Sequence, residues 1–300
     1  MARNTSRAIP HPPRSALTEP RPIVVTGVST GIGRAIAQSL VAAGHPVFGS
    51  VRTAEDAAAF EVQLGPAAKA LVFDVRDEAA IRAAAESLEP TVGTTGIAGL
   101  VNNAGIAIAG PLEDLPLGRL REQIEINLIG TLAVTQAFLP LLKTGAPGRI
   151  VNISSVSGLV AFPFMGPYAA SKFALEALSD SLRLELGVHG IRVIVVEPGG
   201  IATPIWTKAE EEAAAGIGAY DGSPYQAGLA QIRGFAGAVA REGLAPDSVA
   251  RVVLAALKAR RPRVRYAVSR SPMQDRLMRM MPTRLLDRIV TRRLGLNRRR

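Results

Sequence analysis

Seven short apolar runs constrain the fold of this chain more than any other feature of its sequence. The first is Ile23–Val25, and the others lie at 47–51, 70–73, 97–101, 150–153, 191–196 and 264–268. The run Ile23–Val25 is continuously apolar, which is typical of a strand that is buried on both faces of a parallel sheet. Because helical patterns alternate with the runs, strand–helix–strand units with right-handed crossovers are expected. We therefore predict one doubly wound α/β domain, with about seven parallel strands and helices on both faces.

A glycine-rich turn follows the first strand. Gly27, Gly31 and Gly33 stand between this strand and a helical pattern that ends at Gly44. Glycines at such a place let the backbone turn tightly and approach a pyrophosphate, while the helix N-terminus presents free N–H groups. The spacing is GxxxGxG, which differs from the GxGxxG dinucleotide fingerprint. Taken alone, the turn is also compatible with a purely structural role.

Tyr168 and Lys172 are four residues apart in a predicted helix that runs to about residue 186. Side chains at i and i+4 share one face of a helix. Tyrosine titrates near pH ~10, and a neighbouring ammonium lowers the pKa of the phenol by Coulomb attraction. Ser155, at the end of the run 150–153, would hold a carbonyl oxygen that Tyr168 protonates. On the YxxxK pair alone, a half-buried tyrosine beside a solvated lysine is the alternative.

Together these residues resemble the active site of the short-chain dehydrogenase/reductase family. Ser155 precedes Tyr168 by thirteen residues, which is the family spacing and sets it apart from Ser154 and Ser157. The resemblance implies a Rossmann-type fold and an oxidoreductase that uses a nicotinamide cofactor. It covers about residues 22–205 in family order: TGVSTGIG, Asn102-Asn103-Ala104-Gly105, Asn127, Ser155, Tyr168, Lys172 and Pro198-Gly199.

The resemblance also implies a role for each matched residue. Tyr168 is the expected general acid or base, Lys172 stabilises the phenolate and binds the nicotinamide ribose, and Ser155 orients the substrate oxygen. Asn127 is expected to hold a water that relays protons to Lys172, while Asn102 is read as structural. The residues expected to contact the cofactor are Gly27, Ser29, Thr30, Gly31, Ile32, Gly33, Arg52, Asp74, Val75, Asn103, Ala104, Gly105, Tyr168, Lys172, Pro198, Gly199, Ile201 and Thr203.

The end of the second strand indicates which nicotinamide cofactor is used. NAD-binding members place a carboxylate there to bind the ribose 2′-OH, whereas a cation favours the 2′-phosphate of NADP. In this chain Val51 occupies the acidic position and Arg52 follows it. A guanidinium can stack on adenine and bind phosphate through two hydrogen bonds. The sequence favours NADP(H) over NAD(H), with a solvated Arg52 as the alternative.

The substrate is expected to be an apolar ketone, aldehyde or alcohol, because few charges face the predicted pocket. TGVSTGIG, VFGSVR and the apolar loop before Tyr168 resemble the hydroxysteroid and retinol dehydrogenase branch, which implies a steroid-, retinoid- or lipid-like substrate. The segment 203–245 is expected to include a lid over the pocket. The residues predicted to line the substrate pocket are Val160, Phe162, Phe164, Met165 and Trp206.

The positive charge of the chain is concentrated at its C-terminus. The net charge is +10, and residues 258–300 hold fifteen Lys and Arg against two Asp, or +13, so residues 1–257 carry 10 − 13 = −3. We divide the chain into a polar, Pro-rich leader at 1–20 that we expect to be disordered, a catalytic domain at 21–269, and a basic extension at 270–300. Arg284, Arg288 and Arg292 beside Leu285 and Ile289 predict a basic amphipathic helix. It would cover an apolar surface of its own or a neighbouring subunit, or lie on an anionic membrane.

The rest of the composition limits which metal sites, membrane contacts and partners are expected. It has no cysteines, and its three histidines are far apart, so no metal site is predicted. No apolar run approaches the ~20 residues of a membrane span, which favours a cytoplasmic protein with at most peripheral membrane contact. Family resemblance implies a homodimer or homotetramer. Nothing beyond the basic tail suggests nucleic-acid binding, so no specific nucleic acid is expected.

Other functions remain open at this point. One alternative is an NAD-dependent alcohol dehydrogenase of the same fold. Another is a regulatory protein that binds NADP without turnover, although such proteins tend to lack the Tyr or Lys that this chain has. An epimerase or dehydratase ranks lower, because those relatives usually have a longer C-terminal substrate domain and a different glycine spacing.

Overall fold

The structure is a computed structural model that describes residues 20–207, 222–271, 273, 277–278 and 280–296. It confirms the predicted seven-stranded parallel sheet, in the order β3-β2-β1-β4-β5-β6-β7. The predicted leader, except for its last residue, and the central part of the predicted lid lie outside the described residues. The strands are β1 (Ile23–Val25), β2 (Val47–Val51), β3 (Ala68–Val72), β4 (Gly99–Asn102), β5 (Arg149–Ile153), β6 (Arg192–Pro198) and β7 (Arg265–Val268).

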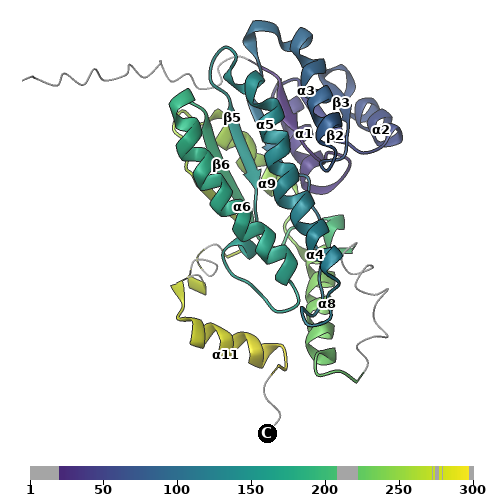
Figure 1. The fold of residues 1–300 in the computed structure, drawn as a ribbon, viewed down its shortest axis with the longest axis vertical. Helices are drawn as coiled ribbons and strands as arrows, with labels where there is room; N and C mark the ends of the chain where they lie inside the picture. The colour runs from purple at the N-terminus through teal and green to yellow at the C-terminus, as the bar shows by residue number, and fades with distance from the viewer. Residues whose placement is uncertain (1–19, 208–221, 272, 274–276, 279, 297–300) are drawn as a thin grey trace, which may run out of the picture.

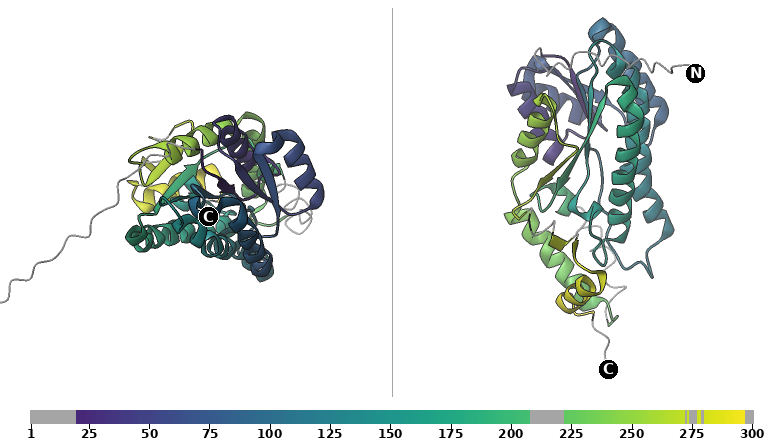
Figure 2. Two further views of the ribbon diagram at one scale, coloured as in Figure 1. Left: turned by 90° about the horizontal axis from the view of Figure 1, so that it is seen from above. Right: turned by 90° about the vertical axis from the view of Figure 1, so that its left-hand side faces the viewer.

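Helices cover both faces of the sheet, as predicted (Figures 1 and 2). The longer ones are α1 (Gly31–Ala42), α2 (Ala54–Leu64), α3 (Glu78–Val92), α4 (Leu117–Ile124), α5 (Gly130–Lys143), α6 (Gly166–Glu185), α8 (Gln226–Glu242), α9 (Asp247–Lys258) and α11 (Thr283–Arg293). One apolar core lies between the sheet and α1, α2 and α9. The other lies between the sheet and α3, α5 and α6.

The ends of several elements show what the apolar pattern detects and what it misses. Asp77 caps α3, since its carboxylate accepts the Ala80 N–H at 3.0 Å. The edge strand β3 begins two residues earlier than expected. The exposed Lys69 interrupts the apolar pattern there, and an edge strand can carry such a charged side chain because it is not covered on all sides. Gly44 has φ +87° and follows Ala43, so it takes the left-handed position just after the end of α1.

A single wide turn joins α4 and α5 into a helix of 27 residues, Leu117–Lys143. The π-helical segment Glu125–Ile129 forms this turn and contains Asn127. By length and apolar composition alone this helix would suffice to cross a membrane, which corrects the expectation from the sequence. Val134, Phe138 and Leu142 on one side of it are fully buried against the sheet and α3, so this side of the helix belongs to the core.

Buried amides link the two central strands to the helices that cover them. Asn102 on β4 donates to Thr135 of α5 at 3.0 Å and to Asn152 of β5 at 2.9 Å. Asn152 in turn donates to Ser179 of α6 at 2.8 Å. Because buried polar groups are stable only when hydrogen-bonded, this chain of contacts fixes α5 and α6 against the sheet. Asn102 therefore has a structural role, and it does not line the cavity described below.

Candidate active site

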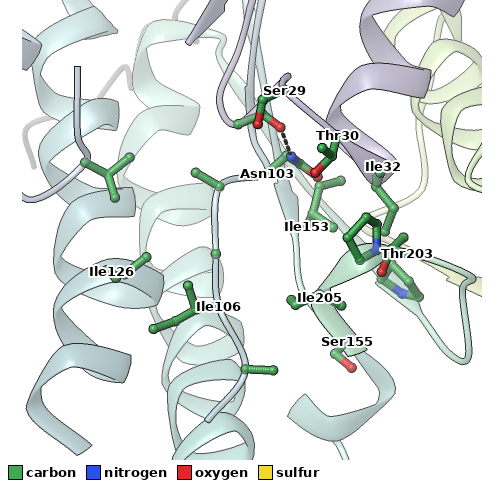
Figure 3. Close-up of a pocket in the computed structure, with 18 of the residues that line it drawn as sticks. Ser29, Thr30, Ile32, Asn103, Ile106, Ile126, Ile153, Ser155, Thr203 and Ile205 are labelled. Carbon is green, nitrogen blue, oxygen red and sulfur yellow. Dashed lines mark hydrogen bonds between the residues drawn. The ribbon is translucent and has the colours of Figure 1, made fainter. Parts of the chain in front are cut away.

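All strands end at one edge of the sheet, and a cavity of about 350 Å³ opens there. Doubly wound sheets bind ligands at this edge, at the point where the strand order reverses. Here that point lies between β1 and β4. Figure 3 shows Ser29 and Thr30 at one end of the cavity and Ser155 at the other, with Ile106 on one side and Thr203 on the opposite side.

The structure brings almost every predicted cofactor residue to this cavity. Gly33 lies behind the lining instead, and its role is packing: a Cβ on Gly33 would be 2.1 Å from the Gly27 carbonyl oxygen. The predicted residues that line the cavity are Gly27, Ser29, Thr30, Gly31, Ile32, Arg52, Asp74, Val75, Asn103, Ala104, Gly105, Tyr168, Lys172, Pro198, Gly199, Ile201 and Thr203.

The glycine turn is held open by contacts with its neighbours. Gly27 has φ +69° and donates its N–H to Ser50 Oγ at 3.0 Å. Asn103 Nδ2 donates to the carbonyls of Thr26 and Gly27 at 2.9 and 3.1 Å, so Asn103 braces the turn as well as lining the cavity. The side chain of Thr30 does not cap α1, which leaves the first N–H groups of the helix directed at the cavity. This cradle fits a pyrophosphate.

Charged side chains surround the cavity at the ends of β2 and β3. Arg52 and Asp74 both line it, and the positive charge of Arg52 contributes to lowering the pKa of Asp74. The larger cause is Arg76, which binds the Asp74 carboxylate through Nε and Nη2 at 3.0 and 2.7 Å. Sequence reasoning missed Arg76, whose only signal was its position two residues after Asp74. The cavity therefore has two guanidinium groups where a ribose phosphate is expected.

Ser155, Tyr168 and Lys172 come together at the other end of the cavity. Ser155 follows β5, and its Oγ accepts the Ser157 N–H at 3.1 Å, which fixes the hydroxyl at the strand end. Tyr168 and Lys172 are buried on the first turns of α6. Lys172 Nζ lies 5.8 Å from the centre of the Tyr168 ring and donates to the Ile153 carbonyl at 2.8 Å. The three side chains thus form one constellation at the cavity.

Burial dominates the titration of both α6 residues. It raises the pKa of Tyr168, against a smaller lowering by the hydrogen bond with Ser155. It lowers the pKa of Lys172 to about 8, against an opposing influence of the Glu176 carboxylate. The expected lowering of the phenol pKa by Lys172 does not prevail here, because desolvation penalises the charged forms of both groups. At neutral pH Tyr168 is therefore a phenol, which can donate a proton to a substrate oxygen.

Asn127 is not among the residues that line the cavity, and its side-chain hydrogen bonds within the described part of the chain do not include one to Lys172. Its Nδ2 donates to the Ile106 carbonyl at 3.0 Å and to Ser171 Oγ at 3.1 Å, and its Oδ1 accepts the Ile106 N–H at 2.9 Å. Gln123, one turn earlier, binds the backbone of Ile106 and Ile108. These amides thus hold the segment after β4 in place. The predicted water relay through Asn127 remains a prediction.

The predicted substrate residues divide into two groups. Trp206 lines the cavity, and its ring meets the Tyr168 ring edge-on at 6.5 Å. Met165 belongs to the same buried apolar cluster as Tyr168. Neither Met165 nor the other three loop residues, Val160, Phe162 and Phe164, are among the lining residues. Apolar residues that sequence reasoning did not single out for the wall include Ile106, Ala107 and Ile126, which follow β4 or lie on the wide helical turn.

Phe164 supports the wall from outside. It has φ +67°, a left-handed conformation that costs about 1 kcal/mol or more in a non-glycine residue. Its carbonyl accepts the Gly110 N–H at 2.8 Å, and its ring meets that of Tyr225 edge-on at 6.0 Å. A Cβ on Gly228 would lie 2.7 Å from the Phe164 ring, so α8 packs closely on it. Phe164 therefore joins the loop before α6 to the segment after β6.

A doubly wound fold with a glycine cradle and a buried Ser–Tyr–Lys constellation defines a nucleotide-dependent oxidoreductase. The profile of the short chain dehydrogenase family matches residues 21–214, and the chain belongs to this family. It is 40% identical over 271 residues to an NADPH-dependent 3-dehydrocapnine reductase of Ornithobacterium rhinotracheale, covering 89% of this chain and 94% of that protein.

Two further relatives extend the comparison. Retinol dehydrogenase 5 of Mus musculus is 39% identical over 184 residues, which are 61% of this chain and 57% of that protein. This likeness confirms the expected resemblance to the retinol dehydrogenase branch. A short chain dehydrogenase of Burkholderia cenocepacia, solved in complex with NADP, superposes with a TM-score of 0.71 at 25% identity, covering 91% of this chain and 98% of that one.

Replacing Lys172 by Met is predicted to make the fold more stable at neutral pH. The pKa of Lys172 is about 8 in the folded protein and ~10.4 when unfolded. Between these values the unfolded chain binds more protons, so the stability of the natural protein rises with pH there. Below pH 8 the buried ammonium costs its full amount, and removing it should raise Tm by roughly 2–6 °C.

Thermal unfolding at pH 7 and pH 10 measures this effect. The difference in Tm between the variant and the natural protein should shrink at the higher pH, because the folded protein then holds Lys172 in its neutral form and no longer buries an ammonium. Lys143→Met, at an exposed position on α5, is the matched control and should change Tm little at either pH. A Lys172→Met protein that melts below the natural one at pH 7 contradicts the prediction.

Proposed function

We propose that this chain is an NADPH-dependent reductase of apolar ketones or aldehydes, acting in reverse on the corresponding alcohols. The observation that carries the proposal is the shared cavity, which is lined both by Ser155, Tyr168 and Lys172 and by the residues of the glycine cradle. The named activities of the 3-dehydrocapnine reductase and retinol dehydrogenase relatives support a carbonyl or alcohol substrate.

The nicotinamide cofactor fits the residues that line the cavity. Gly27, Ser29 and Thr30 would receive its pyrophosphate, while Arg52 and Arg76 would face a 2′-phosphate. Asn103, Ala104 and Gly105 would line the ribose, and Thr203 lies on the side where the carboxamide is expected. When bound, the reduced cofactor supplies the hydride that the protein itself has no group to provide.

Each catalytic side chain has a defined task at the substrate oxygen. Ser155 would donate a hydrogen bond to the carbonyl and polarise it. Tyr168, which burial keeps protonated, would transfer its phenolic proton to the oxygen as hydride reaches the carbon. Lys172 would hold the ribose and stabilise the phenolate that forms. Trp206 and Ile205 give this end of the cavity an apolar wall, which suits a steroid-, retinoid- or lipid-like group beside the carbonyl.

The surface of the chain supports two further proposals on its partners. Phe173 and Leu184 of α6 and Ile129 before α5 are large apolar side chains that the described chain leaves exposed. A homodimer or homotetramer through these helices would cover them, and a monomeric mass in sedimentation velocity would contradict it. No specific nucleic acid is expected as a partner, and we place the protein in the cytoplasm with peripheral membrane contact.

Helix α11 supports the membrane contact. Leu286, Val290 and Leu294 lie on its more covered side, and Leu294 is buried near Gly228 of α8. Leu285 and Ile289 stay 47% and 45% exposed beside the exposed Arg284 and Arg288. The helix thus packs on the body by one side and leaves a basic, apolar stripe free. Figure 1 shows α11 at the same end of the molecule as α8.

Replacing Tyr168 by Phe is predicted to lower kcat for ketone reduction by a factor of about 10²–10⁴, because the proton donor is lost. The affinity for NADPH should stay almost the same, since only the hydroxyl is removed. Loss of NADPH absorbance against a panel of apolar ketones measures turnover, and fluorescence titration measures binding. An active Tyr168→Phe enzyme would falsify the assignment, and a natural protein that binds NADPH without turnover would favour the regulatory alternative.

Replacing Arg52 by Ala is predicted to weaken NADPH binding about tenfold, which corresponds to ~1.4 kcal/mol, and to leave NADH binding unchanged. The physical reason is that only NADPH has a 2′-phosphate for the guanidinium to bind. Fluorescence titration of both cofactors measures the ratio. Arg82→Ala, at an exposed arginine on α3 that pairs with Glu78, is the control. Equal weakening of both cofactors would contradict NADP preference through this residue.

Replacing Leu285 and Ile289 by Glu is predicted to abolish binding to anionic vesicles. The natural protein should float with phosphatidylglycerol vesicles, detach in high salt, and ignore phosphatidylcholine vesicles, because binding joins apolar burial to charge attraction. Val62→Glu, which places a charge at an apolar residue of α2 that is 86% exposed, should float like the natural protein. Failure of the natural protein to float with anionic vesicles would rule out this contact.

A further inference from the structure

A cluster of acidic side chains lies behind the active site, between α6, β6 and β7. Arg265 of β7 stands at its centre. Its Nε is 3.0 Å from Glu176 Oε2 and 3.4 Å from Glu197 Oε1, and its Nη2 is 2.8 Å from Asp180 Oδ2. One guanidinium therefore faces three carboxyl groups. Asp180 is also paired with Arg183, whose Nε lies 3.5 Å from Asp180 Oδ1. A further cation close to Glu176 would be favoured by Coulomb attraction.

Lys172 is that second cation. It precedes Glu176 by four residues on α6, so the two side chains lie on the same face of the helix. Both residues are buried, at 6% and 8% exposure. Low exposure matters, because water screens a charge pair much less in the interior than at the surface. The attraction between the Glu176 carboxylate and the Lys172 ammonium is therefore less screened than it would be at the surface.

The packing around Gly158 brings Glu176 close to the catalytic end of the cavity. A Cβ on Gly158 would lie 3.1 Å from the Lys172 carbonyl oxygen, 3.2 Å from Glu176 Cγ and 3.0 Å from Ser154 Oγ. Gly158 thus leaves room for α6 to approach the strand end that bears Ser155. Only Oε2 of Glu176 is bound by Arg265, and its buried Oε1 makes no hydrogen bond to any residue that the structure describes. The negative charge of Glu176 is therefore not fully compensated by Arg265.

We propose that Glu176, anchored by Arg265, is a positioning residue that keeps the buried Lys172 in its ammonium form. Glu176 does not line the cavity, so it acts on the reaction only through Lys172. The proposal rests on the proposed function in one respect, since it takes the ammonium of Lys172 to stabilise the phenolate that Tyr168 forms during the reaction. Its physical content, the charge state of Lys172, does not depend on turnover.

Other charged and titratable groups also face Lys172. On α6, Tyr168 precedes Lys172, and Asp180 and Arg183 follow Glu176. Arg265 of β7 contacts Glu176 and Glu197 and not Lys172. The wide helical turn next to α6 presents the neutral Asn127 through Ser171. The cavity in front of Lys172 is lined by the charged residues Arg52, Asp74, Arg76 and Glu122. Glu176 is the carboxylate that raises the pKa of Lys172, against the lowering by burial.

Titration of Lys172 by NMR tests the proposal directly. The chain has five lysines, Lys69, Lys143, Lys172, Lys208 and Lys258, so protein labelled with [13Cε]lysine gives few signals, and Lys172→Met assigns the one of interest. Glu176→Gln keeps the shape of the side chain and removes its charge. We expect the midpoint of Lys172 to move to lower pH by about one unit, because an opposite charge nearby favours the ammonium.

The pH dependence of ketone reduction gives a second readout. Activity that needs the ammonium is lost as pH rises through the Lys172 midpoint, so Glu176→Gln should move the falling alkaline limb of kcat/KM to lower pH by a similar amount. Glu176→Asp retains the negative charge, so its alkaline limb should stay close to that of the natural protein. Asp180→Asn removes a carboxylate that also binds Arg265, one turn further along α6, and should leave the midpoint nearly unchanged.

The outcomes separate the two proposals. An unchanged Lys172 midpoint in a folded Glu176→Gln protein overturns the role of Glu176, whatever the enzyme turns over. An equal shift from Asp180→Asn overturns it too, because it would show a general effect of the cluster. If the midpoint moves as expected while Tyr168→Phe remains active, the role of Glu176 stands and the proposed catalytic mechanism fails.

Discussion

Parallel pairing of all seven strands is the constraint on which the rest of the structure depends. Because each strand enters from the same side, the residues that follow β1 to β6 meet at one edge. Side chains from positions as distant in sequence as Thr30 and Thr203 therefore share one cavity. The connections between the strands form the helical layers, so the same pairing creates both cores. The cradle and the Ser–Tyr–Lys constellation are two ends of a single sheet edge.

The catalytic side chains at this edge are subject to two opposing electrostatic effects. A proton donor and a cation are most effective away from water, yet burial penalises every charge it encloses. In this chain the penalty favours a neutral Tyr168 and weakens the ammonium of Lys172. The Ile153 carbonyl and the acidic cluster around Arg265 act in the opposite direction. The site thus combines desolvation with nearby groups that limit its cost.

Much of this arrangement could be predicted from the sequence. Apolar runs identified the strands because a doubly covered sheet leaves no polar alternation, and fixed spacings singled out Ser155, Tyr168 and Lys172. Arg76 was missed because its bond to Asp74 depends on the path of the chain after β3. The loop residues around Phe164 were expected inside the cavity. Their apolar character predicts burial but not the side from which they are buried, and the ring of the left-handed Phe164 packs on α8 and not into the cavity.

The wide turn at Glu125–Ile129 has a consequence for how this chain can vary. Gln123, Asn127, Thr131 and Thr135 are buried polar residues spaced by four, and all are hydrogen-bonded. In a regular helix a spacing of four drifts by about 40° at each step, whereas a wider turn takes up part of that drift. Removing one residue here would rotate the rest of α5 by about 100° relative to α4. The wide turn thus sets the rotational phase between the half of the helix that holds the segment after β4 and the half that packs on the sheet.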